Sequence, residues 1–220
     1  METSQKRAAP AKEQVYRELK AAILSLELKP GQAIVESVVG ELYGISRTPA
    51  REALSRLVDE GLVEVVPRKG YFVAPVTLQD VLESYHLRIL MEPEAAALAA
   101  ERGDPRVVEA LRQNMEQHMQ KATVELNREF HLLIAQASGN QRLARLISQL
   151  LDDVERVALL DPYMLTPDGS GHDEHLVIIE AIQRRDAEAA RACMKGHLEQ
   201  GRDRALALLQ QGGQATIRFR

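Results

Sequence analysis

The 220-residue sequence predicts a mainly α-helical protein in two parts, the first of which ends in a small β-hairpin. Three observations support this prediction: helical apolar spacing along most of the chain, a strand signal confined to residues 62–76, and an uneven charge. Residues 1–75 carry 11 Lys and Arg and 10 Asp and Glu, a net +1, whereas residues 76–220 carry 17 and 22, a net −5. The first part is therefore the better candidate for contact with phosphate.

The first part opens with three predicted helices after a flexible polar arm at residues 1–12. The first helix starts near residue 13 and stops at the turn Pro30-Gly31, and the second covers residues 35–44. A tight connection then leads to the third helix, for which we expect Ser46 to be the N-cap. This arrangement predicts a helix-turn-helix.

The third helix has two different faces. Its inward apolar stripe consists of Ala50, Ala53, Leu54 and Leu57. Arg47, Thr48 and Arg51 fall on the outward side of its first two turns. A helix of this kind enters the DNA major groove, where Arg bonds two acceptors of guanine and hydroxyl groups bond phosphates or bases. The alternative is that these arginines form an ordinary solvated surface.

Residues 62–76 contain two β-branched stretches, LVEVV and YFVAPV, which predict the two strands of a hairpin. Arg68, Lys69 and Gly70 form its tip. Together with the three helices, the hairpin predicts a winged helix-turn-helix domain over residues 13–76.

The second part, residues 77–212, predicts an antiparallel bundle of six helices, followed by a tail at residues 213–220. The predicted helix starts lie at or near Thr77, Asp104-Pro105, Thr123, Asn140, His172 and Asp186. Thr77 and Asp80 have the spacing of a capping box, and residues 161–171 read as a loop.

Several classes of protein are excluded by composition. The sequence has no run of 18 or more apolar residues and no signal peptide at its start, so we expect a cytoplasmic protein that does not associate with membranes. The lone Cys193 excludes an intramolecular disulfide.

Three histidines fall on inward helix faces of the predicted bundle. His131 lies one turn after Asn127, and His175 and His197 each share a face with apolar residues. One such histidine is usually a satisfied core residue, but three on separate helices are costly to bury unless they have a use. The pattern therefore favours a metal site. We expect His86, His118 and His172 to lie at the surface or in loops.

The stretch LKPGQAIVESVVGELYGISRTPAREALSRLVDEGLVEVVPRKGYFVAPV resembles the N-terminal domain of GntR-family transcriptional regulators almost end to end. The resemblance implies that Ser46, Arg47, Thr48 and Arg51 contact an operator, and that the wing tip Lys69-Gly70 approaches the minor groove. The sequence departs from the family pattern at residues 38–40. There we expect Gly40 to weaken the second helix by up to about 1 kcal/mol relative to Ala.

Residues 78–212 resemble the FCD ligand-binding domain of the FadR subfamily, through LRILMEPEAAALAA, NREFHLLIAQASGNQRL and EHLVIIEAIQRRDAEAARACMKGHL. Many such domains hold a divalent metal through an Asp and three His, at positions that correspond here to Asn127, His131, His175 and His197. We expect zinc or nickel. Because Asn127 provides a neutral oxygen, the alternatives are a weaker site, a site that selects a different metal, or one that leaves more of the coordination to the effector.

The same resemblance places Arg88 close to the carboxylate of an effector. The alternative for Arg88 is a helix-surface ion pair with Glu92, four residues later. The sequence thus predicts a homodimeric transcriptional repressor that binds an inverted repeat in double-stranded DNA. A small carboxylic acid in the helical domain is expected to control it. The alternatives are a helical metalloenzyme or a structural metal domain fused to a DNA-binding module, but no HExxH motif favours an enzyme.

Overall fold

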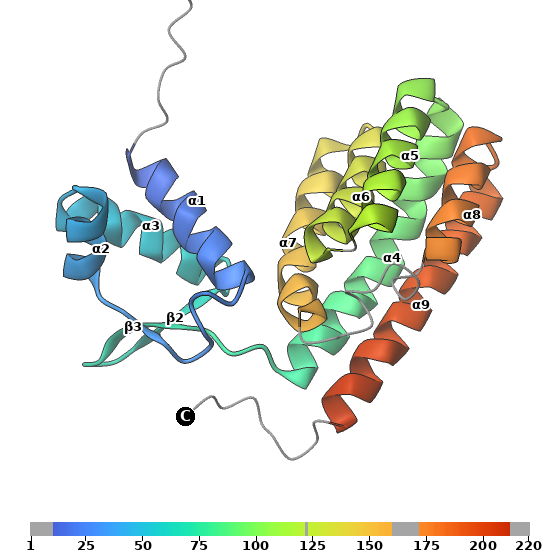
Figure 1. Cartoon of the computed structure of the whole chain (residues 1–220). Coiled ribbons are helices and arrows are strands. Elements are labelled where there is room, and N and C mark those ends of the chain that lie inside the picture. The colour runs from blue at the N-terminus through green and yellow to red at the C-terminus, as the bar shows by residue number, and fades with distance from the viewer. Residues whose placement is uncertain (1–10, 122, 160–171, 212–220) are drawn as a thin grey trace, which may run out of the picture. The chain divides into compact units, whose positions relative to one another are not determined.

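A computed structural model describes residues 11–121, 123–159 and 172–211 of the chain. Residue contacts divide these into two compact units, one up to residue 75 and the other from residue 76 onward (Figure 1). Each unit has a hydrophobic core of its own. The arm at residues 1–10, the loop at residues 161–171 and the tail from residue 213 lie outside the described residues.

The first unit is a winged helix-turn-helix, as predicted. Its elements are α1 (Ala11–Leu24), β1 (Ala33–Ile34), α2 (Glu36–Tyr43), α3 (Arg47–Asp59), β2 (Val63–Val66) and β3 (Gly70–Val73). β2 and β3 form the predicted antiparallel hairpin. The sequence did not predict β1, which pairs antiparallel with β3 and completes a sheet of order β1-β3-β2. Two residues are too few to produce an alternating pattern.

The inward stripe of α3 is buried as predicted, at residues 50, 53, 54 and 57. A polar cluster also joins α1 to the end of α3. The Tyr16 hydroxyl donates to the Glu60 carboxylate at 2.7 Å, and the Lys20 ammonium lies 2.8 Å from the same group. The Arg56 guanidinium lies 3.6 Å from the centre of the Tyr16 ring. These contacts fix the helix that carries the predicted DNA-binding residues.

The turn between α2 and α3 corrects the expectation for Gly40 and confirms Ser46 as the N-cap residue of α3. Gly40 is buried, and a Cβ atom there would lie 2.9 Å from the carbonyl oxygen of Ile45. The Ile45 N–H in turn donates to the Gly40 carbonyl oxygen. The expectation that Gly40 merely weakens α2 is therefore wrong, because the close approach of the backbones requires glycine. Ser46 occupies the N-cap position of α3, but its hydroxyl makes no capping hydrogen bond.

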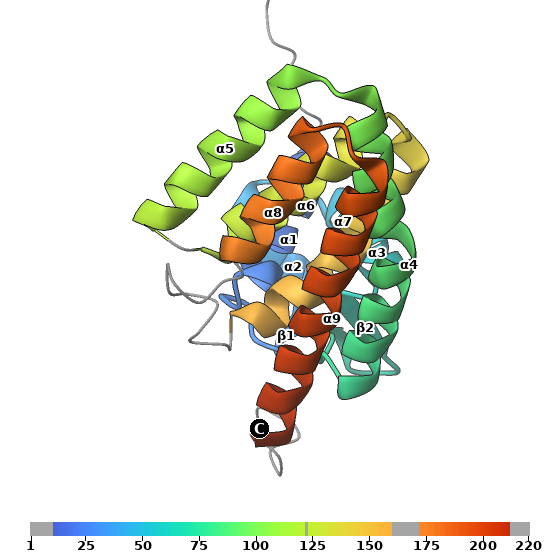
Figure 2. The same ribbon diagram turned by 90° about the vertical axis from the view of Figure 1, so that its right-hand side faces the viewer.

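The second unit is the predicted helical bundle (Figure 2). Its described residues form α4 (Leu78–Arg102), α5 (Pro105–Gln120), α6 (Val124–Ala137), α7 (Gln141–Ala158), α8 (His172–Gln183) and α9 (Ala187–Gln211). The long helices α4 and α9 pack along each other, and α5 packs against α6 and α8. Thr77 and Asp80 form the predicted capping box at the start of α4. No helix in the described ranges is long and apolar enough to cross a membrane.

Candidate metal centre and nucleic-acid interface

Three histidines from three helices meet inside the bundle. They are His131 on α6, His175 on α8 and His197 on α9, with exposed fractions of 1%, 1% and 7%. The Nε2 atom of His197 lies 3.3 Å from the Nε2 atoms of both His131 and His175. Their possible ligand atoms all lie within 4.8 Å of one another. The inward placement predicted for each histidine is therefore observed.

The spacing of these nitrogens fits a metal ion. Two ligands at zinc–nitrogen bond length are about 3.0 Å apart at a right angle and about 3.4 Å apart at the tetrahedral angle. The observed 3.3 Å separations lie within this range. Imidazole nitrogens suit zinc, nickel, copper or iron better than magnesium. The residues present therefore fit a divalent transition metal.

Two carboxylates fix the orientation of two of these rings. The Nδ1 atom of His131 lies 2.6 Å from Glu92 Oε2, and the Nδ1 atom of His197 lies 2.6 Å from Glu174 Oε2. When each Nδ1–H donates to its carboxylate, the Nε2 lone pair is free for the centre between the rings. This pattern of carboxylate, histidine and metal is common around protein-bound metals.

Protonation states agree with this arrangement. Burial lowers the pKa of His131 to about 4, despite the attraction of Glu92, so His131 is neutral near pH 7. Burial raises the pKa of Glu92, but the charges of Arg88 and His131 outweigh it and lower that pKa to about 2. Glu174 also has a pKa of about 2, because hydrogen bonds from His197 and Arg204 outweigh its partial burial.

Arg88 is deeply buried, with 2% of its surface exposed. Its Nε atom donates to Glu92 Oε1 at 2.5 Å, and its guanidinium lies 5.1 Å from the centre of the Tyr85 ring. The expected ion pair of Arg88 with Glu92 is present. It lies inside the bundle, so the expectation that it is a surface pair is wrong. Through Glu92, Arg88 is connected to His131 and thus to the histidine centre.

Asn127 is also buried, one helical turn before His131 on α6. Its side chain makes no hydrogen bond with another described residue, which leaves its amide oxygen available. The structure thus shows that Asn127 is buried on the helix that carries His131, and its role as a ligand stays a prediction.

Some site residues were missed by sequence reasoning. Glu92 and Glu174 were not assigned to the histidines, although Glu92 lies on the same helix as Arg88 and Glu174 directly precedes His175. The sequence also did not predict the contact of Arg204, which donates to Glu174 at 3.1 Å. His118, expected at the surface, is 1% exposed, and its ring centre lies 6.5 Å from that of His175. Its position three residues after the buried Met115 was the available signal.

The predicted DNA-contacting residues are all exposed. Ser46, Arg47, Thr48 and Arg51 lie at the start of α3, and Lys69 and Gly70 lie at the hairpin tip. Arg51 is held by Glu36 of α2, whose two carboxylate oxygens accept from its Nε at 2.8 Å and its Nη2 at 3.0 Å. This contact lowers the pKa of Glu36. Glu36 therefore positions the guanidinium of Arg51, and it would compete with DNA for the same N–H donors.

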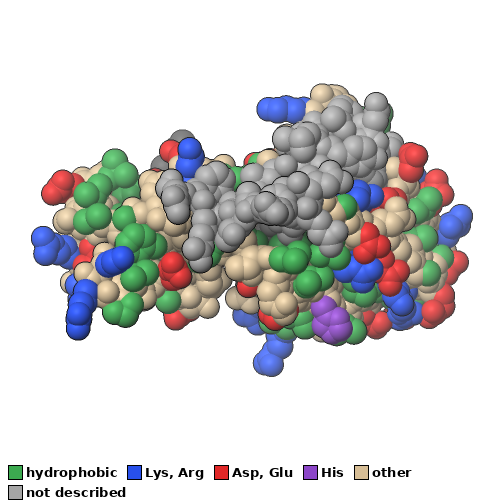
Figure 3. Space-filling view, turned by 90° about the horizontal axis from the view of Figure 1, so that it is seen from below, with side chains coloured by type: hydrophobic (Ala, Val, Ile, Leu, Met, Phe, Trp, Pro, Cys, Tyr) green, Lys and Arg blue, Asp and Glu red, His purple; other side chains and the backbone are tan. Residues whose placement is uncertain are grey.

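Basic and acidic side chains are interspersed on the surface of the molecule that Figure 3 shows. This agrees with the nearly balanced charge of residues 1–75, counted above as net +1. A net charge of +1 gives the first unit little excess of basic residues, so the predicted contacts with DNA are confined to the start of α3 and the hairpin tip.

A winged helix-turn-helix with an arginine-bearing recognition helix defines a DNA-binding protein. The chain belongs to the GntR family. The sequence profile described as "Bacterial regulatory proteins, gntR family" matches residues 11–73, and that of the FCD domain matches residues 83–200.

Similar proteins are transcriptional regulators. The chain is 32% identical to an uncharacterized HTH-type transcriptional regulator in an unstable DNA locus of Streptomyces ambofaciens, over 84% of this chain and 80% of that protein. It is 28% identical to the HTH-type transcriptional repressor RspR of Escherichia coli (strain K12), over 91% of each chain. The solved structure of E. coli McbR/YncC, 26% identical, superposes with a TM-score of 0.78 over 94% of this chain and 100% of that one. The protein is therefore a DNA-binding transcriptional regulator and not an enzyme.

Proposed function

We propose that this regulator is a dimeric repressor whose operator affinity is controlled by a small organic acid bound at a metal centre in the helical unit. The observation that carries the proposal is the convergence of three histidine Nε2 atoms, with carboxylates on the Nδ1 atoms of two of the rings. His131, His175 and His197 would hold zinc or nickel, and the Asn127 oxygen would be a fourth ligand.

The charges at this centre favour an acidic effector. Neutral imidazoles and a neutral amide do not offset the charge of a divalent ion, and the nearby carboxylates Glu92 and Glu174 are already paired with Arg88 and Arg204. A bound divalent ion would supply a positive centre for a carboxylate oxygen. Glu92 accepts from only one N–H of the Arg88 guanidinium, so other donors of Arg88 remain for a second effector oxygen.

DNA recognition would use Arg47, Thr48 and Arg51 in the major groove, with Ser46 at the adjacent phosphate and the wing tip Lys69-Gly70 at the minor groove. Two copies related by a two-fold axis would read an inverted repeat. The acid can change operator affinity only if it binds the DNA-competent and DNA-incompetent states with different affinities. The proposal that the protein represses transcription is supported by the relative that is named a repressor.

Elemental analysis of the purified protein after gentle dialysis tests the metal. We expect close to one divalent transition metal per chain and its loss in His131→Ala, with His86→Ala, an exposed histidine of the same unit, as the matched control. Retention of the metal by His131→Ala would contradict the assignment. A melting curve of each metal-free variant checks that the chain still folds.

A thermal-shift screen of carboxylic acids, with and without zinc or nickel, tests the effector. Any acid that prefers the folded state raises the melting temperature, and we expect that rise only in the presence of metal. Arg88→Lys keeps the charge but loses the planar fork, so acid affinity should fall while DNA affinity without acid is kept. If the metal raises the melting temperature but no acid raises it further, the role of the metal is purely structural.

A further inference from the structure

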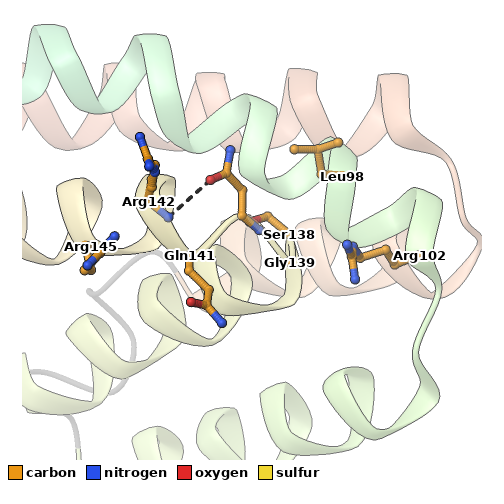
Figure 4. Close-up of a pocket in the computed structure, with 8 residues that line it drawn as sticks. Leu98, Arg102, Ser138, Gly139, Gln141, Arg142 and Arg145 are labelled. Atoms are coloured by element: carbon orange, nitrogen blue, oxygen red, sulfur yellow. Dashed lines mark hydrogen bonds between the residues drawn. The ribbon is translucent and has the colours of Figure 1, made fainter.

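A second polar feature of the helical unit lies on its outside, where α6 ends and α7 begins. A shallow hollow of about 600 Å³ is present there (Figure 4). Three arginines border it: Arg102 at the end of α4, and Arg142 and Arg145 in the first turns of α7. The hollow is separate from the histidine centre, because Ser138 in its wall is seven residues, or about 10 Å of helix, beyond His131.

The three arginines lack acidic partners. Within the described ranges, none of them forms an ion pair or a hydrogen bond through its side chain, and no acidic residue lines the hollow. Other arginines of this unit do face carboxylates, such as Arg128 with Asp152 and Arg191 with Glu94. Residues 76–220 carry a net charge of −5, yet this hollow is lined by three arginines and by no acidic residue.

One of the three arginines lies close to the backbone of the turn between α6 and α7. Gly139 has φ +69°, and a Cβ atom built there would lie 2.0 Å from Cζ of Arg102. The guanidinium of Arg102 therefore lies against the α6–α7 turn, in the space that a side chain at position 139 would occupy. Arg142 and Arg145 are three residues apart, which places both on the same side of α7. In Figure 4 they lie on one side of the Ser138-Gly139 turn and Arg102 lies on the other.

The backbone N–H groups at the start of α7 are not all free to bind an anion. The Asn140 side-chain oxygen already accepts from the backbone N–H groups of Arg142 and Leu143. Binding would therefore rest on the guanidinium groups, whose planar forks match the oxygens of phosphate and carboxylate. Arginines on two sides of the hollow suit a ligand with two separated anionic groups better than one with a single group.

We propose that this hollow binds a small polyanion carrying at least two phosphate or carboxylate groups, independently of the acid at the histidine centre. The helical unit would then have two separate ligand sites, one for the acid at the histidine centre and one for a polyanion in this hollow. Because the arginines are exposed, we expect modest affinity that weakens as salt is added.

Isothermal titration of the full chain, stripped of metal, with pyrophosphate and separately with citrate tests the proposal. Removing metal prevents either probe from binding an ion at the histidine centre. We expect saturable binding of at least one probe and a loss of roughly 10-fold in affinity in Arg102→Ala and in Arg142→Ala/Arg145→Ala. Arg112→Ala removes the same charge from an exposed arginine that bonds Gln183, and it should leave the affinity unchanged.

The relative affinities of the two probes assign the ligand class. Tighter pyrophosphate binding assigns the site to phosphates, and tighter citrate binding assigns it to polycarboxylates. Absence of binding at millimolar probe, or an equal loss of affinity in Arg112→Ala, would overturn the proposal. Circular-dichroism melting should show that these surface variants fold like the wild type.

Discussion

Glu92 and Glu174 each accept a hydrogen bond from a histidine of the centre, but they lie in different surroundings. Glu92 and its partner Arg88 are both 2% exposed, whereas Glu174 and its partner Arg204 are 22% and 27% exposed. The variants Glu92→Gln and Glu174→Gln each remove one negative charge and keep the size of the side chain. Comparing the two variants separates the contribution of each carboxylate to metal affinity from its contribution to the stability of the fold.

The two variants should differ strongly in stability. Glu92→Gln leaves the buried charge of Arg88 without its partner, which should lower the free energy of unfolding by about 3–5 kcal/mol. Glu174→Gln should cost only about 1 kcal/mol, because solvent reaches Arg204 and screens its charge. Both variants should weaken metal binding by about 10- to 100-fold, since each removes the carboxylate that orients a ligating ring.

Two assays give these quantities. Urea unfolding of the metal-free proteins measures stability, and competition with a chromophoric chelator measures metal affinity. Equal stability losses in both variants would refute the argument from burial. Unchanged metal affinity in both variants would refute the role of the carboxylates, even if the stability difference were found.

Three further predictions concern the first unit. Arg51→Ala should weaken operator binding by roughly 10- to 100-fold and blunt discrimination against a scrambled site in a gel-shift assay; unchanged binding would remove this side chain from the interface. Gly40→Ala should lower the melting temperature, because contact with the Ile45 carbonyl outweighs a helix-propensity gain of up to about 1 kcal/mol; a higher melting temperature would show that the turn relaxes. Burial raises the pKa of Glu60, but hydrogen bonds from Lys20 and Tyr16 outweigh it, so the folded pKa lies below the ordinary 4.5. Its contribution is then fully present above pH 4.5 and is lost as the pH falls through the folded pKa, a loss that Glu60→Gln should remove from acid-unfolding curves.

The starts of α4, α5 and α6 were predictable because the signals that set them are local, whereas α1 ends at Leu24, before the predicted stop at Pro30-Gly31. The Thr77 and Thr123 hydroxyls accept from backbone N–H groups three residues later, and the Asp104 carboxylate accepts from Arg106, as their spacing implied. β1 was not predictable, because Ala33 and Ile34 form a strand only by pairing with β3. The role of Gly40 also depends on its close approach to the Ile45 carbonyl oxygen, which helix propensity does not describe.

The burial of His131, His175 and His197 was predictable for a similar reason, since helical spacing shows which face of a helix is buried. Helical spacing does not show which residue of another helix lies opposite. Glu92 meets His131 across 39 positions of sequence, and Glu174 meets His197 across 23. Burial of the pair Arg88 and Glu92 likewise depends on the packing of α4 within the bundle, not on the spacing of the two residues.

We propose above that an acid bound at the histidine centre controls the affinity for DNA. Fluorescence anisotropy with operator DNA, selected by the purified protein from a random library, tests it most directly. The acid identified by thermal shift is titrated into metal-loaded and metal-stripped protein. We expect a change in DNA affinity of about 5- to 150-fold for the loaded protein and none for the stripped protein. The same change in both, or no change in the loaded protein, would contradict it.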